Sequence, residues 1–191
     1  MQNWVQRRTS DRDLERRTRQ IKEIVRIGMS LRADMDLESV LAQIVEAITS
    51  TLGFGAAVLN LAHEENTHFE VVATAGVGEA ERQRLVQSPP LVARLLAVMR
   101  PEFCISHSYF ISHHYKHVLD GVEGVTLPSS LPPSAQRAPD AWHPEDVLFV
   151  PLISPGGDRL LGILSLDQPE DGKVPSLESI EMLELFASQA A

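Results

Sequence analysis

A short segment in the middle of the chain concentrates side chains that could bind a metal ion. The stretch PEFCISHSYFISHHYKH, residues 101–117, holds the single cysteine and four of the seven histidines. Cys104 and His107 have a C-x-x-H spacing, and His113 and His117 would share one face of a helix. The pattern is more typical of a strand followed by a loop, in which successive side chains point to opposite faces. We therefore predict no metal ion, and keep a site formed by Cys104, His107, His113 and His117 as the alternative.

The thiol of Cys104 could also be reactive. A histidine close to a thiol lowers the thiol pKa and increases its reactivity. A single cysteine within a strand more commonly packs as a small apolar side chain. We therefore expect Cys104 to be buried and structural.

The aromatic residues of this region suggest a pocket for an organic molecule. Aromatic residues make up 5% of the chain, yet both tyrosines and two of the six phenylalanines fall within residues 101–117. Ligand pockets are mostly apolar and carry a few directed polar groups. An equally good interpretation is that these rings complete the core beneath a loop. The ligand contacts that we predict come from six side chains: Phe103, Tyr109, His113, Trp142, Asp146 and Asp167.

Composition excludes several other functions. The formal net charge is −9, which argues against a protein that binds the phosphate backbone of nucleic acids. No apolar run approaches the roughly 20 residues needed to cross a bilayer, so we expect a cytoplasmic protein without a membrane segment. The sequence has no paired carboxylates, nucleophile elbow or phosphate-binding loop. We therefore predict a domain that is not an enzyme and that has no cofactor, with an unknown small molecule as its ligand.

The elements that would position these side chains begin with a polar N-terminal helix. Residues 1–33 are predicted to form a coiled-coil-like helix, and residues 34–191 to form the main domain. Apolar residues of this helix repeat at intervals of three, four and seven, which favours a narrow seam and pairing in a homodimer. The seam residues are Leu14, Ile21, Ile24 and Leu31.

The remaining pattern predicts an α+β fold. A helix should begin after Asp36 as its N-cap and end at Gly53. Two hairpins follow from the short turns between apolar runs, which indicates an antiparallel sheet flanked by helices. The predicted strands are GAAVLNLA, THFEVVATAG, EFCISHSYFI, DVLFVPLI and RLLGILSLD, and the last helix is SLESIEMLELFASQAA, capped by Ser176. We expect the apolar face of that helix to include Leu177 and Leu185. Residues 118–145 have no periodicity and predict a long loop or lid.

Two parts of this pattern resemble the GAF domain of bacterial multi-sensor signalling proteins of the histidine kinase or diguanylate cyclase type. The first is VLFVPLISPGGDRLLGILSLDQPEDGKVPSLESIEMLELFASQAA, with its VPL strand, its LGILSLD strand and the closing LFASQAA. The second is SLRADMDLESVLAQIVEAITSTLGFGAAVLNL. The similarity covers residues 30–75 and 146–191.

The resemblance implies a GAF-like central antiparallel sheet of five to six strands, with terminal helices bundled on one face and a small-molecule pocket on the other. It places residues 100–146 over that pocket. It also implies a non-catalytic sensor that relays ligand occupancy through dimeric N- and C-terminal helices to an output domain in a longer protein, from which the last helix would be cut.

This sequence departs from several known subgroups of that family. The residues that mark cyclic-nucleotide-binding members cannot be traced, and methionine-sulfoxide-reducing members need several cysteines. Bilin-carrying members commonly have histidine directly after the attachment cysteine, whereas Ile105 follows Cys104 here. Two alternatives stay open: a cofactor-bearing sensor with haem, metal or bilin near Cys104 and the histidines, and a dimerisation module without a ligand.

Overall fold

A computed structural model of the chain describes residues 36–63, 65, 67–122, 138, 140–157, 159–188 and 190. The predicted N-terminal helix, with Leu14, Ile21, Ile24 and Leu31, lies outside the described residues. In the described part no helix has the length and apolar character that crossing a membrane requires.

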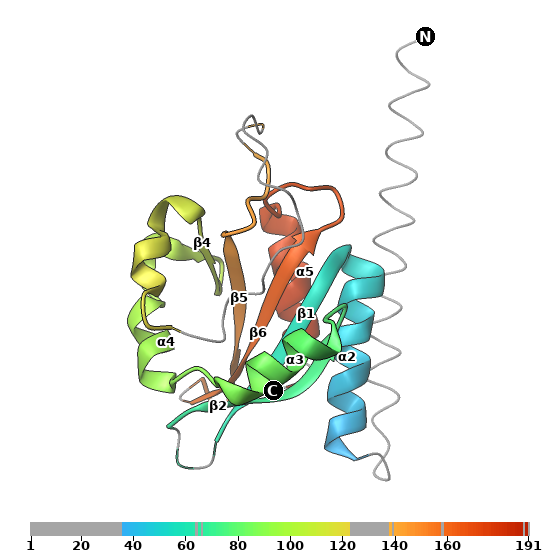
Figure 1. Cartoon of the computed structure of the whole chain (residues 1–191). Helices are drawn as coiled ribbons and strands as arrows, with labels where there is room; N and C mark the ends of the chain where they lie inside the picture. The colour runs from blue at the N-terminus through green and yellow to red at the C-terminus, as the bar shows by residue number, and fades with distance from the viewer. Residues whose placement is uncertain are drawn as a thin grey trace.

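An antiparallel sheet forms the centre of the domain (Figure 1). Its six strands lie in the order β2-β1-β6-β5-β4-β3, and every pairing is antiparallel. Their bounds are Phe54–Ala62 for β1, Phe69–Ala75 for β2, Cys104–Ile105 for β3, Ser108–Ile111 for β4, Val147–Ile153 for β5 and Leu160–Pro169 for β6. The fold is therefore α+β, as the sequence predicts.

Two helices from opposite ends of the described chain cover one face of the sheet. α2 (Leu37–Leu52) starts where the Asp36 carboxylate accepts a hydrogen bond from Ser39 N, and it ends at Gly53, whose φ of 75° suits glycine. α5 (Leu177–Ala187) is capped by Ser176. Both helices pack on the main hydrophobic core (Figure 1). We call this side the helix face.

The opposite face of the sheet carries two shorter helices, α3 (Glu79–Gln87) and α4 (Val92–Val98). Side chains of β6 alternate between the two faces, so that Leu164 joins the main core while Ile163 packs below α4. The apolar side chains on this face form two separate clusters, one including Leu95 of α4 and one including Leu85 of α3. We call this side the ligand face, because the resemblance to GAF domains implies a small-molecule pocket on the side opposite the terminal helices.

The structure corrects two details of the predicted elements. The stretch EFCISHSYFI is not one strand: β3 and β4 form a hairpin that turns at Ser106, whose φ is 58°. This segment is flanked by the 3-10 helices Pro101–Phe103 and His113–Leu119. In addition, Leu177 and Leu185 are more than half exposed rather than buried, because α5 offers only one stripe to the core.

Candidate functional site

Three polar side chains lie next to one another on the ligand face. Asn60 is on β1, and Ser165 and Asp167 are two residues apart on β6. The register pairs Asn60 with Ile163 and Val58 with Ser165, so the three side chains follow one strip along the same face. Their exposed fractions are 0%, 3% and 3%. The strip separates the apolar cluster under α3 from the cluster under α4.

Most polar atoms of this strip have no hydrogen-bond partner within the described part of the chain. These atoms are both side-chain atoms of the Asn60 amide, the Ser165 hydroxyl and Oδ2 of Asp167. A buried polar group without a partner costs about 1–3 kcal/mol of stability. Three side chains with such groups in one strip therefore reduce the stability of the fold. Polar groups of this kind orient a ligand in an apolar pocket.

The carboxylate of Asp167 is half satisfied. Its Oδ1 accepts hydrogen bonds from Trp142 Nε1 at 2.8 Å and from Gln168 N at 2.6 Å. Burial raises the pKa of Asp167 to about 6, although these two hydrogen bonds act in the opposite direction and the charge of Asp146 adds to the increase. The pKa of this carboxyl group therefore lies closer to neutral pH than that of an ordinary aspartate.

The cover of the strip is weakest at α3. Leu85 is the single buried residue of this helix in the structure, whereas α4 buries Val92, Leu95 and Val98. An element with few buried apolar contacts opens at low free energy. The unpartnered atoms are sealed from solvent, and α3 is the part of their cover with the fewest buried side chains.

The aromatic side chains predicted to contact a ligand are part of the core. Trp142 is fully buried, and its ring lies 5.8 Å from that of Phe110. Tyr109 stacks on Phe149 with ring centroids 5.5 Å apart, and burial raises its pKa. Phe103 is 6% exposed and lines a surface pocket of about 290 Å³ together with Tyr115.

His113 and Asp146, which the sequence also singled out, contact each other directly. Oδ1 of Asp146 accepts from His113 N at 2.7 Å and lies 2.9 Å from His113 Nδ1. Its Oδ2 accepts from His143 N at 2.7 Å, and the His113 and His143 rings stack at 3.9 Å. Asp146 thus ties the segment after β4 to the start of β5. The three residues also form a group that could hold a metal ion.

The other residues of the alternative metal site lie in different places. Cys104 is exposed, contrary to the expectation that it is buried, and its Sγ donates to Ser106 O at 3.2 Å. His107 faces α5, and His117 borders the pocket next to Phe103. Within the described residues, the groups with metal-binding geometry contain neither Cys104, His107 nor His117.

A carboxylate of α5 holds the turn between β3 and β4. Glu184 accepts hydrogen bonds from Ser108 Oγ at 2.7 Å, Ser106 Oγ at 2.8 Å and His107 N at 2.8 Å. Burial raises the pKa of Glu184, but the hydrogen bonds outweigh burial and hold it below its usual value. This contact joins the outer part of the sheet to the C-terminal helix.

Asn60 is a candidate site residue that the sequence analysis missed. It stands in the apolar run GAAVLNLA, and a polar residue inside a buried strand is the signal that would have indicated it. Ser165 occupies the same kind of position in LGILSLD.

Comparison with known structures finds the same architecture in GAF domains of several bacterial proteins. The GAF domain of an Acinetobacter phosphoenolpyruvate-protein phosphotransferase superposes with a TM-score of 0.60 at 14% identity, covering 90% of this chain and 89% of that one. The GAF domain of a putative sensor histidine kinase from Pseudomonas syringae pv. tomato gives a TM-score of 0.53 at 17% identity, covering 94% and 89%. The phycocyanobilin-bound GAF domain of a cyanobacterial phytochrome gives 0.57 at 14% identity, covering 90% and 91%.

The sequence comparisons agree with this architecture. The chain matches none of the curated proteins with which it was compared. The profile of the GAF domain matches residues 36–191, which is more than half of the chain. The chain therefore belongs to the GAF domain family, whose members are typically non-catalytic sensory and regulatory domains of signalling proteins.

Proposed function

We propose that this domain senses a small organic molecule that binds on the ligand face against Asn60, Ser165 and Asp167. The observation that carries the proposal is the strip of buried polar atoms without partners. The Asn60 amide and the Ser165 hydroxyl each donate and accept, and the free oxygen of Asp167 accepts when ionised. The ligand would therefore have several hydrogen-bonding groups along one edge and an apolar surface that contacts neighbours such as Val58 and Ile163.

The signal would pass from the ligand face to the terminal helices. Displacement of α3 and a change in the packing of β6 would shift the strands of the sheet. The shift would reach α5 because Glu184 of α5 accepts hydrogen bonds from the turn at residues 106–108. A coupling of about 1–3 kcal/mol is sufficient for useful regulation. An output domain in a longer protein would read the change.

Replacing the unpartnered amide tests the ligand strip. Asn60→Leu is expected to raise the free energy of unfolding by about 1–2 kcal/mol, because a group of similar volume replaces two buried polar atoms that have no partner. It should also abolish binding. Urea unfolding measures the stability, and native mass spectrometry of freshly purified protein together with a thermal-shift screen of small metabolites measures binding.

Two buried serines provide matched controls for this experiment. Ser165→Ala removes a hydroxyl without a described partner and should stabilise the protein, whereas Ser108→Ala removes the hydroxyl that donates to Glu184 and should destabilise it. If Asn60→Leu lowered stability by more than about 1 kcal/mol, or if every stabilising compound acted equally on wild type and variant, the proposed site would be wrong.

We also propose that two copies pair through their terminal helices. Leu177 and Leu185 of α5 are 54% and 53% exposed, and Leu37 of α2 is 63% exposed, so these helices offer apolar side chains to a second copy. Sedimentation of the whole chain is expected to give a dimer, and Leu185→Glu to shift it toward monomer. A monomer mass that does not change with concentration would contradict pairing.

A chromophore-bearing sensor is the second candidate function. One observation favours it: Cys104 is exposed, as covalent attachment of a bilin requires. This cysteine lies on the edge strand β3, whereas β1 with its Asn60 lies next to the other edge strand, β2. Protein incubated with phycocyanobilin and then denatured should keep its visible absorbance if Cys104 attaches the bilin, and should lose it if the thiol does not react.

A further inference from the structure

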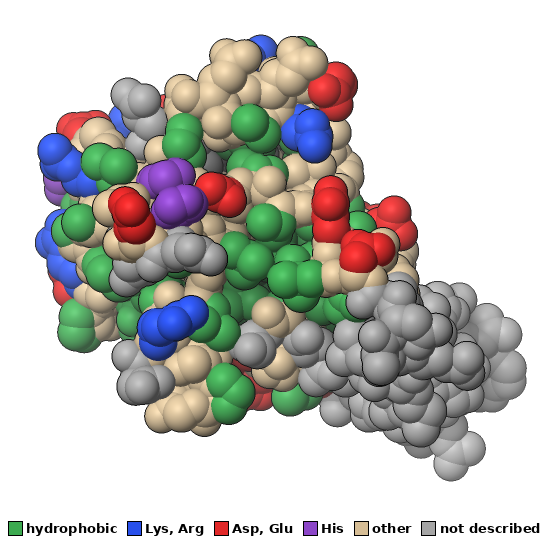
Figure 2. All heavy atoms as spheres, turned by 90° about the horizontal axis from the view of Figure 1, so that it is seen from below, with side chains coloured by type: hydrophobic (Ala, Val, Ile, Leu, Met, Phe, Trp, Pro, Cys, Tyr) green, Lys and Arg blue, Asp and Glu red, His purple; other side chains and the backbone are tan. Residues whose placement is uncertain are grey.

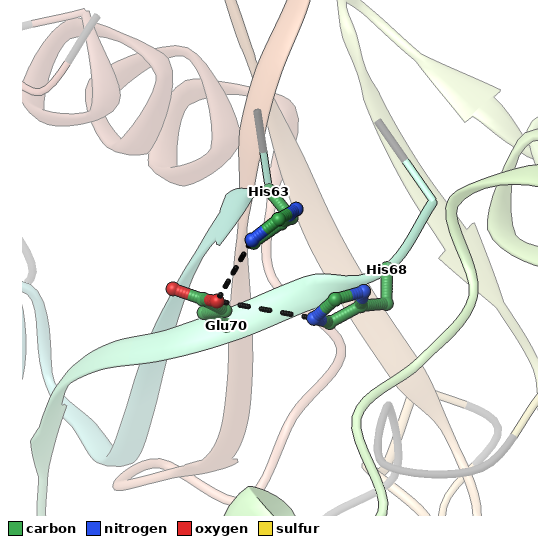
Figure 3. A group of neighbouring side chains, drawn as sticks. All are labelled: His63, His68 and Glu70. Atoms are coloured by element: carbon green, nitrogen blue, oxygen red, sulfur yellow. Dashed lines mark ion pairs between the residues drawn. The ribbon is translucent and has the colours of Figure 1, made fainter. Parts of the chain in front are cut away.

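The end of the β1–β2 hairpin brings two histidines and a glutamate together (Figure 3). His63 follows β1 and His68 precedes β2, and the ladder continues through a hydrogen bond from His63 N to His68 O of 2.9 Å. The two imidazole rings stack with centroids 4.8 Å apart. Glu70 lies two residues after His68 and therefore on the same side of the strand. Its Oε1 is 3.7 Å from His63 Nε2 and 3.8 Å from His68 Nε2.

We propose that His63, His68 and Glu70 form a binding site for a divalent transition metal ion of the Zn²⁺ type. The three ligand atoms lie within 4.8 Å of one another. Around a tetrahedral zinc ion, nitrogen and oxygen ligands at about 2.0–2.2 Å are roughly 3.3 Å apart. The Glu70 distances therefore need to shorten by about 0.5 Å, and the two stacked imidazole rings would have to turn so that both Nε2 atoms face the ion. Two imidazoles and one carboxylate leave an open position for water.

The choice of metal follows from the ligand atoms. Imidazole nitrogen suits Zn²⁺, Ni²⁺ and Cu²⁺, whereas Ca²⁺ and Mg²⁺ prefer oxygen ligands throughout. One carboxylate between two neutral imidazoles gives the site a net negative charge, which attracts a cation. Both imidazoles must be neutral to bind, so protons compete with the metal ion for these nitrogen atoms.

Hydrogen bonds hold one of the imidazoles in a ligating orientation. Thr67 Oγ1 lies 3.0 Å from His68 Nδ1, and a proton on Nδ1 leaves the lone pair on Nε2, the atom that faces Glu70. His63 Nδ1 accepts from Glu65 N at 3.4 Å, which is a long hydrogen bond. Metal binding through Nε2 would move the His63 proton to Nδ1 and give up this contact.

The main chain that carries the site is fixed from both sides. On one side β1 pairs with β2 up to His63, and on the other the segment before α4 bridges to the start of β2. Phe69 N donates to Pro90 O at 2.9 Å, and Val92 N donates to Thr67 O at 3.2 Å. The ligands are therefore preorganised by backbone hydrogen bonds rather than carried by a free loop. The site is independent of the proposed function, because Glu70 and Leu61 form a pair on the helix face of the sheet.

Zinc titration of the whole chain tests this site. Isothermal titration calorimetry of metal-free protein at pH 7.5 is expected to show one Zn²⁺ per chain at His63, His68 and Glu70. His63→Gln, His68→Gln and Glu70→Gln should each weaken that binding at least tenfold. These side chains are partly or mostly exposed, so the variants should fold, and thermal melts of the metal-free proteins check this. Co²⁺ should give visible d–d absorption that is lost in the same variants.

His143→Gln is the matched control, because His113, His143 and Asp146 form the other group with metal-binding geometry in the described residues. Zinc binding that this control leaves unchanged supports the hairpin site, as does a stoichiometry of two that falls to one in His63→Gln. Binding that is lost in His143→Gln and kept in the three hairpin variants would overturn the proposal. So would the absence of any measurable heat or Co²⁺ absorption.

Discussion

Trp142→Ala is expected to lower the free energy of unfolding by about 3–5 kcal/mol, the range for truncating a buried large aromatic side chain. Trp142 is 0% exposed and belongs to the main hydrophobic core. Its Nε1 also donates the 2.8 Å hydrogen bond to Asp167. The substitution would leave a cavity and remove a buried hydrogen bond together. Urea unfolding followed by far-UV circular dichroism gives the change.

Trp142→Phe separates these two contributions. It keeps most of the ring volume but removes the indole N–H, so we expect a smaller loss of about 1–2 kcal/mol. The sequence alone had suggested Trp142 as a ligand contact. If Trp142→Ala left stability within about 1 kcal/mol of the wild type while ligand binding disappeared, that interpretation would be preferred to a core role.

Asp167→Asn is expected to change how stability depends on pH. Because the pKa of Asp167 in the folded protein is about 6, against 3.8 for an ordinary aspartate, the folded state favours the neutral acid. Protonated Asp167 contributes its full share to the free energy of unfolding below about pH 4, and this contribution is lost as the pH rises through about 6. Relative to Asp167→Asn, the wild type should therefore lose up to about 3 kcal/mol between pH 4 and pH 7.5.

The comparison with the variant is essential because other carboxylates act in the opposite direction. Hydrogen bonds lower the pKa of Asp36, and the ion pair with Lys116 lowers that of Glu145. The stability that these two carboxylates contribute to the folded protein is therefore lost as the pH falls. The near-isosteric Asn keeps an acceptor for Trp142 Nε1. Parallel pH profiles of wild type and variant would show that Asp167 is ionised throughout, and the explanation from burial would fail.

Local signals in the sequence were sufficient to predict most of the fold. Asp36 and Gly53 mark the ends of α2 with a side-chain cap and a left-handed glycine, and apolar runs with short turns gave β5 and β6. The turn at Ser106 was missed because a positive φ at serine has no sequence signature comparable to glycine or asparagine.

The candidate site was harder to predict because it depends on register. Asn60 and Ser165 become neighbours only when β1 and β6, which are about 100 residues apart, pair as Val58 with Ser165. His63, His68 and Glu70 likewise converge only through the hairpin. The aromatic segment attracted attention by composition, but whether a ring fills the core or faces a cavity is decided by packing, as the complete burial of Trp142 shows.

The two outer strands of the sheet are poor templates for adding a further strand. β3 is only two residues long. β2 has a bulge in its pairing with β1 and an exposed Glu70, and His68, just before β2, bridges to Leu91. A short, bulged or charged edge is how natural proteins avoid edge-to-edge aggregation. Figure 2 shows a face of the domain on which apolar side chains lie in the middle and charged side chains lie around them. Self-recognition by this chain would therefore use side-chain surfaces, whose specificity evolution can adjust residue by residue, rather than the generic hydrogen bonding of exposed backbone.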